Sequence, residues 1–83
     1  MKFRKKPLVV DAVQWRGDNV AEIVALGGDK VLFGPESPPV VLTANGLVGL
    51  QRGAWLVRDP GSGETWPVAE AIFPATYEPA EEA

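Results

Sequence analysis

Four side chains in the second half of the chain are the candidates for contact with another molecule. They are Arg52, Arg58, Trp66 and Pro67. Tryptophan and arginine are enriched where proteins bind one another, because both bury large surfaces and donate directed hydrogen bonds. Proline cannot donate a hydrogen bond to a β-ladder, so its strand lies at a sheet edge or leaves it unpaired. Edges are where sheets join other chains. We therefore take these residues as the candidate interaction surface.

The chain has little of the usual chemistry of catalysis. It contains no cysteine and no histidine. This excludes disulfides, thiol nucleophiles, Cys/His zinc sites and a Ser-His-Asp relay within the chain. No two acidic residues have the spacing of metal ligands within one motif. We expect a protein that is not an enzyme, with no catalytic residue, no metal and no cofactor.

Two other arrangements would give these residues a ligand. Trp15, Trp55 and Trp66, helped by Arg52 or Arg58, could stack on a nucleotide-like molecule. In a chain of 83 residues, however, tryptophans more often form the core, which is the interpretation we favour.

The loop 59–63 offers a second possibility, because its backbone N–H groups could hold an anion. No helix follows to add its dipole, so a plain hairpin loop is favoured. Arg58 and Glu64, which flank this loop, are expected to pair across it rather than to clamp a ligand.

Arg58, Trp66 and Pro67 belong to a predicted central hairpin, and Arg52 lies in the turn that leads into it. Its strands are residues 53–58 and 64–68, and the loop between them is rich in Gly, Pro and Ser. A loop of five residues sets Leu56 opposite Trp66, with Ala54 opposite Val68. Both faces of this hairpin are then largely apolar. The second face must be covered by curling of the sheet, by the chain's ends or by another subunit, so a homo-oligomer is expected.

The remaining elements follow from periodicity and turn signals. A central strand is predicted over residues 8–15, and a helix of about eight residues from Val20, with Asp18 or Asn19 as its cap. The apolar stripe expected on this helix is Val20, Ile23, Val24 and Gly27. Further strands are expected at residues 31–33, 40–43, 47–50 and 76–78, with a stiff loop at 34–39. A type I′ turn is expected at Asn45-Gly46, and a bulge or bend at Gly49. One helical turn is expected at 69–73, ended by Pro74, with Ile72 and Phe73 in the core.

Together these elements predict a single α+β domain spanning residues 1–83. Its expected form is a small curled, mainly antiparallel sheet of about five or six strands, barrel-like, with one packed short helix. Residues 1–6 form a basic N-terminal arm and residues 80–83 a frayed acidic tail. The net charge is −3, and an acidic body repels phosphate, so nucleic acid is not expected as a partner. No apolar run is long enough for a membrane span or for the core of a signal peptide. We therefore expect no membrane as a partner and a cytoplasmic protein.

Two blocks of the sequence carry a resemblance to a known family. The first is Met1–Trp15 followed by Gly17-Asp18-Asn19; the second combines Gly53–Arg58, Gly63-Glu64, Pro67, Ile72-Phe73 and Thr76-Tyr77-Glu78. Together they resemble a family of small bacteriophage and prophage proteins of unknown function. The chain departs from that family at Ala54, where an aspartate is common, and at Val68, where a cysteine often stands. The resemblance implies a phage origin and a host-cell setting, without implying a reaction.

The sequence thus leads to three hypotheses about function. The first is a non-enzymatic phage accessory protein that binds a host protein during infection, in the cytoplasm of the host bacterium. The second is an oligomeric binder, or sponge, of a nucleotide-like small molecule. The third is a minor structural protein of the virion.

Overall fold

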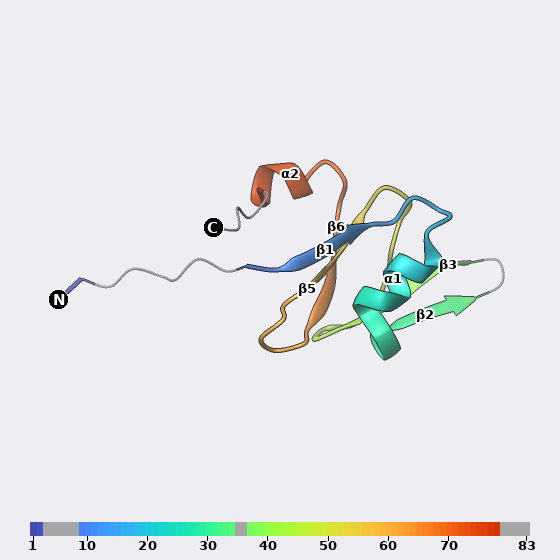
Figure 1. Ribbon diagram of the computed structural model, residues 1–83, viewed down its shortest axis with the longest axis horizontal. Helices are drawn as coiled ribbons and strands as arrows, with labels where there is room; N and C mark the ends of the chain where they lie inside the picture. The colour runs from blue at the N-terminus through green and yellow to red at the C-terminus, as the bar shows by residue number, and fades with distance from the viewer. Residues whose placement is uncertain (3–8, 35–36, 79–83) are drawn as a thin grey trace.

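The computed structural model describes residues 1–2, 9–34 and 37–78, and in them the chain forms two antiparallel sheets of three strands each (Figure 1). The first has the order β1-β5-β6 and the second β2-β3-β4. The elements in chain order are β1 (Asp11–Gln14), α1 (Val20–Gly27), the 3₁₀ turn η1 (Gly28–Lys30), β2 (Val31–Gly34), β3 (Ser37–Thr43), β4 (Gly46–Gly49), β5 (Trp55–Arg58), β6 (Thr65–Val68) and α2 (Phe73–Thr76).

The α+β class and the antiparallel pairing are confirmed, but the single barrel-like sheet is wrong. The strands divide into two sheets because β4 and β5 do not pair with each other. Leu50, which follows β4, turns its fully buried side chain into the space between the sheets. The Thr65 hydroxyl of β6 donates to the Leu42 carbonyl of β3 at 2.9 Å and so ties the two sheets together. Most of the predicted basic arm and all of the predicted acidic tail lie outside the described residues.

One hydrophobic core lies between the sheets and helix α1. Its buried apolar residues are Trp15, Ile23, Val31, Val41, Leu50, Ala54 and Leu56. Trp15 is therefore a core residue, as the favoured interpretation expected.

Helix α1 has the predicted length but buries only half of the predicted stripe. Ile23 and Gly27 are buried, whereas Val20 and Val24 are exposed. A Cβ added at Gly27 would collide with Val31 and crowd Leu56, so the missing side chain lets the helix approach the sheets closely. The helix therefore faces the core with the side that carries Ile23 and Gly27, and Val20 and Val24 lie outside this contact.

Asn19 begins the helix without capping it through its side chain. Its buried amide instead accepts a hydrogen bond from the Arg16 N–H and donates one to the Gln14 carbonyl, both at 2.8 Å. The residue therefore joins the end of β1 to the start of α1.

Strand β1 is shorter than predicted and lies at an edge rather than in the centre. Its residues pair only with β5, from Asp11 opposite Arg58 to Gln14 opposite Trp55. Beyond the strand, the backbone N–H of Trp15 donates to the Ala54 carbonyl at 2.9 Å. The central position belongs to β5, and its two flanking strands explain why Leu56 and Val57 are both fully buried.

The expected stiff loop at 34–39 is wrong for residues 37–39, which begin β3; residues 35–36 lie outside the described part. Prolines are tolerated here because extended backbone suits their fixed φ, and because their missing donors fall where the ladder is interrupted. Pro38 and Pro39 both lie opposite Phe33, where the register of β2 and β3 shifts by one residue. Pro39 pairs beyond the end of β4, where its carbonyl accepts the Leu50 N–H at 2.7 Å.

The hairpin β3–β4 forms at the predicted place with a different turn. Gly46 has a positive φ of 111° but Asn45 does not, so the turn is not of type I′. The two-residue connection is Ala44-Asn45, and the Thr43 hydroxyl both accepts the Asn45 N–H and donates to the Gly46 carbonyl. No bulge lies at Gly49, which pairs regularly with Val40; the register shift is between β2 and β3, where Phe33 faces both Pro38 and Pro39.

The C-terminal segment differs in part from its prediction. A helical turn does span 69–73, where the Phe73 N–H donates to the Ala69 carbonyl at 3.0 Å, but Pro74 does not end it and lies in the first turn of α2, where a proline costs no hydrogen bond. Thr76 ends this helix and the next residues form no strand. Ile72 is exposed rather than in the core, whereas Phe73 stacks on Trp55 with ring centroids 4.1 Å apart. No helix in the described part of the chain is long and apolar enough to cross a membrane.

Candidate functional site

The hairpin β5–β6, which carries three of the four candidate residues, pairs one residue out of the predicted register. Leu56 lies opposite Pro67, and Val57 opposite Trp66. Six residues, 59–64, separate the strands rather than the five predicted. The Asp59 N–H donates to the Glu64 carbonyl at 3.0 Å, which fixes this register. A one-residue shift moves every side chain of one strand to the other face of the sheet. Trp66 therefore shares a face with Trp55 rather than with Leu56.

Arg58 is used inside the fold. Its guanidinium Nη1 donates to the Leu26 carbonyl at 2.8 Å, in the last turn of α1. The last carbonyls of a helix lack partners within the helix and carry a partial negative charge, so a cation is favourable there. The expected ion pair with Glu64 is not formed. Arg58 is therefore a helix-capping residue in this structure.

The loop between β5 and β6 is a hairpin loop in which the N–H groups of Gly61, Gly63 and Glu64 are already engaged. The Gly61 N–H bonds to the Asp59 carboxylate at 2.9 Å, and the Glu64 N–H to the Ser62 hydroxyl at 3.2 Å. The Gly63 N–H bonds to the Asp59 carbonyl at 2.8 Å. These internal bonds support the favoured interpretation of a plain hairpin loop over an anion-binding nest.

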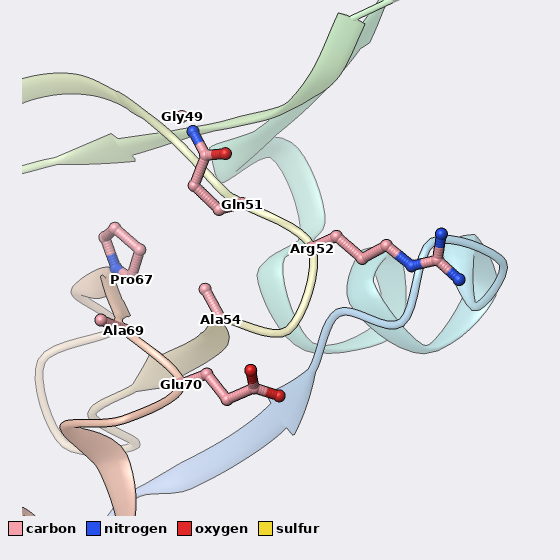
Figure 2. Close-up of a pocket in the computed structure, with 7 residues that line it drawn as sticks. All are labelled: Gly49, Gln51, Arg52, Ala54, Pro67, Ala69 and Glu70. Atoms are coloured by element: carbon pink, nitrogen blue, oxygen red, sulfur yellow. The ribbon is translucent and has the colours of Figure 1, made fainter.

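Arg52 and Pro67, the other two candidates, line the same hollow of about 240 Å³ (Figure 2). The hollow lies between the segment that leaves β4 and the segment that leaves β6. Its lining residues are Gly49, Gln51, Arg52, Ala54, Pro67, Ala69 and Glu70. Strand β6 is at the edge of its sheet, as Pro67 predicted.

The charged groups of this hollow are turned to neighbouring backbone. Figure 2 shows the Arg52 side chain extending away from Pro67 and Ala69. A Cβ added at Gly17 would lie 3.1 Å from the Arg52 Nε, so the guanidinium stem covers that glycine. The Glu70 carboxylate lies against Gly53 and accepts a hydrogen bond from the Gln14 Nε2 at 3.3 Å. The walls that remain are small and apolar except for Gln51.

No tryptophan lines the hollow. Trp15 is in the core, Trp55 stacks on Phe73, and Trp66 is half-buried on the face that it shares with Trp55. A stacking platform made of tryptophan and arginine is therefore not assembled within one chain.

The second face of the hairpin is covered by the chain itself. Trp55, Phe73 and Tyr77 form a continuous stack, the last two rings having centroids 5.1 Å apart. Of the three ways to cover this face, the structure uses the C-terminal segment. The apolar hairpin therefore supplies no argument for a second subunit.

Three exposed leucines gather on one face of the other sheet. Strand pairing sets Leu32, Val40 and Gly49 in one row across β2-β3-β4, and Leu42 and Leu47 in the next row of the same face. Leu32 is 55% exposed, Leu42 42% and Leu47 61%. We call this surface, with Pro38, the outer face: Leu32, Pro38, Val40, Leu42, Leu47 and Gly49.

The outer face contains no charged and no polar side chain. A sheet with one solvated face normally alternates apolar and polar residues along each strand. Here both faces are apolar, because the other row holds Val31 and Val41, which are buried in the core, and Val48, which is 40% exposed. An exposed aliphatic face of this kind is typical of a binding surface.

A sequence signal for this face does exist. No charged residue occurs between Glu36 and Arg52, although two strands and their turn lie in that interval. A search for tryptophan and arginine does not find this face, because its residues are aliphatic or glycine and proline. Within the described ranges, no cluster of three or more acidic side chains could hold a metal ion.

In comparisons with known proteins, no family model, no curated protein and no solved structure matches this chain.

Proposed function

We propose that this protein is a non-enzymatic binding protein that attaches to another protein through the outer face of β2-β3-β4. The observation that carries the proposal is the exposure of Leu32, Leu42 and Leu47 on one uncharged face. Removing apolar surface from water stabilises a complex by about 25 cal/mol per Å² before the costs of association. Aliphatic side chains held by a sheet lose little freedom on binding, which keeps those costs low.

The setting we propose is infection of a bacterium by a phage, with a host protein as the partner. Support for this setting is the resemblance of the two terminal sequence blocks to small phage and prophage proteins. A host protein fits the outer face better than a nucleotide does, because the face lacks the hydrogen-bonding and charged groups that would orient a nucleotide.

The experiment compares proteins recovered with tagged variants from the same extract of infected cells. Leu32→Lys and Leu42→Lys place a charge on the outer face, while Ile72→Lys changes an aliphatic residue that is 56% exposed elsewhere. We expect one host protein to be recovered with the wild type and with Ile72→Lys, and to fall at least tenfold with the two outer-face variants. Circular dichroism must show that all variants are folded.

Equal recovery with all variants would contradict the outer face as the binding surface. Recovery lost only with Ile72→Lys would place the surface at α2. Mass spectrometry that finds only a small molecule of a few hundred daltons would contradict a protein partner and favour the sponge.

A further inference from the structure

Strand β4 has an unprotected edge. Native sheets protect their edges with proline, with charge, or with bulges. In this fold β6 carries Pro67, β1 carries Asp11, and the pairing of β2 with β3 is interrupted by a register shift after Leu32. Strand β4 has the sequence Gly-Leu-Val-Gly, and all four residues are exposed. It has none of these devices.

The pattern of hydrogen bonds shows which backbone groups this edge presents. The Leu50 N–H bonds to the Pro39 carbonyl, so these two residues form a hydrogen-bonded pair of the β3–β4 ladder. Antiparallel ladders alternate between hydrogen-bonded and non-bonded pairs. Val48 therefore bonds to β3, while Leu47 and Gly49 direct their N–H and C=O groups away from it. A second strand can pair with those groups.

We propose that β4 pairs with β4 of a second copy of this chain, antiparallel and about a two-fold axis through Val48. In this register Leu47 of each copy lies opposite Gly49 of the other, and the two Val48 residues face each other. Both bonding residues of each strand are then used, which gives four hydrogen bonds. The axis is perpendicular to the sheet, so the outer faces of both copies lie on the same side.

The side chains of β4 complement themselves in this register. A Cβ at Gly49 would have no atom within 4 Å, so the space above this glycine is open on the outer face. Leu47, at 61% exposed the most open leucine of the outer face, fills that space in the partner. No charge lies on either strand, so bringing two identical edges together costs no like-charge repulsion.

The pairing also enlarges the surface proposed for binding. A stable protein interface buries roughly 800 Å² on each partner, and few exposed side chains make up the outer face of one copy. The paired copies form one six-stranded sheet, in the order β2-β3-β4-β4-β3-β2, with a continuous outer face twice as large. The pairing does not depend on the proposed function, because it uses the strand edge rather than the face.

Sedimentation equilibrium of the purified wild type is the first test, and we expect a dimer mass at micromolar concentrations. Gly49→Val fills the space that Leu47 needs while keeping a residue that suits strands, so it should weaken the dimer at least tenfold. Leu32→Lys is the matched control, because it changes the same face at the far edge of the sheet and should leave the dimer intact. A monomer at every concentration would overturn the proposal. So would a dimer that Leu32→Lys disrupts as strongly as Gly49→Val does, because the copies would then associate through their faces.

A second test does not depend on weakening the fold. Directly opposed residues of a non-bonded antiparallel pair have Cα atoms about 4.5 Å apart, which is within the range of a disulfide. The chain has no cysteine, so Val48→Cys should give a disulfide-linked dimer with oxidised glutathione, and Leu32→Cys should give little. Equal linkage in the two variants, or none in either, would contradict the proposed register.

Discussion

The amide of Asn19 shows, at the scale of a single residue, how a buried polar group organises this fold. It satisfies both the Arg16 N–H and the Gln14 carbonyl, at the point where the chain leaves β1 for α1. No other side chain makes a hydrogen bond to either of these two backbone groups in the described structure. A small apolar residue at position 19 would leave both groups without that partner.

Asn19→Ala is therefore expected to lower the free energy of unfolding by about 1–3 kcal/mol, the usual penalty for a buried unsatisfied group. Urea denaturation followed by tryptophan fluorescence measures the change. Asp18→Ala is the control, because Asp18 is exposed and should shift stability by no more than about 0.5 kcal/mol. The reverse order of the two effects would mean that Asp18, not Asn19, secures the start of the helix.

The identity of residues was a sound guide where one physical requirement dominated. Pro67 predicted an edge strand because a missing donor leaves little choice, and Trp15 was expected in the core because of its size. Arg58 was a poor guide, because its role depends on the Leu26 carbonyl, 32 residues away in sequence. A long cation can reach many partners, and only the folded structure selects one.

At the scale of elements, the aromatic stack of α2 determines which face of the hairpin is open. Trp55 and Phe73 lie almost parallel, at 7°, and Tyr77 continues the stack. A helix of four residues has little stability of its own, so α2 is held mainly by these contacts. The stack is thus both the cover of the hairpin and the anchor of the C-terminal segment.

Phe73→Ala is expected to cost about 1–3 kcal/mol of stability, less than a fully buried phenylalanine because the ring is half-exposed. It should also shift the fluorescence of Trp55 to longer wavelength, since that ring loses its cover. Ile72→Ala, at the exposed neighbour, should change neither quantity appreciably. If Phe73→Ala leaves both unchanged, the C-terminal segment does not cover the hairpin in solution.

The element boundaries show what local sequence can and cannot determine. Helix α1 was predictable because the loop Gly17-Asp18-Asn19 and the pair Gly27-Gly28 bound it on both sides. The register of β5–β6 was not, because a loop of five or six residues satisfies the same turn signals, and the bond between Asp59 and Glu64 decides between them. The start of β3 was missed because two prolines usually exclude a strand, and here each falls at an interruption of the ladder.

At the scale of the whole molecule, the packing of the two sheets determines what remains for a partner. One face of β1-β5-β6 lies against the core and its other face carries the aromatic stack, whereas β2-β3-β4 has a core on one side only. The open surface therefore follows from tertiary packing, which no single element of the sequence encodes. For this reason the sequence pointed to the hairpin as the candidate surface, whereas the folded structure points to the outer face.

The central claim is that the outer face is the surface covered by a protein partner, and residue-resolved carbene footprinting tests it most directly. The tagged protein is labelled in buffer and in an extract of infected cells, at concentrations that give the same oligomeric state. We predict that labelling of Leu32 and Leu42 falls several-fold in the extract while labelling of Ile72 is unchanged. Labelling that stays equal at all three residues, or that falls at Ile72 alone, would contradict the claim.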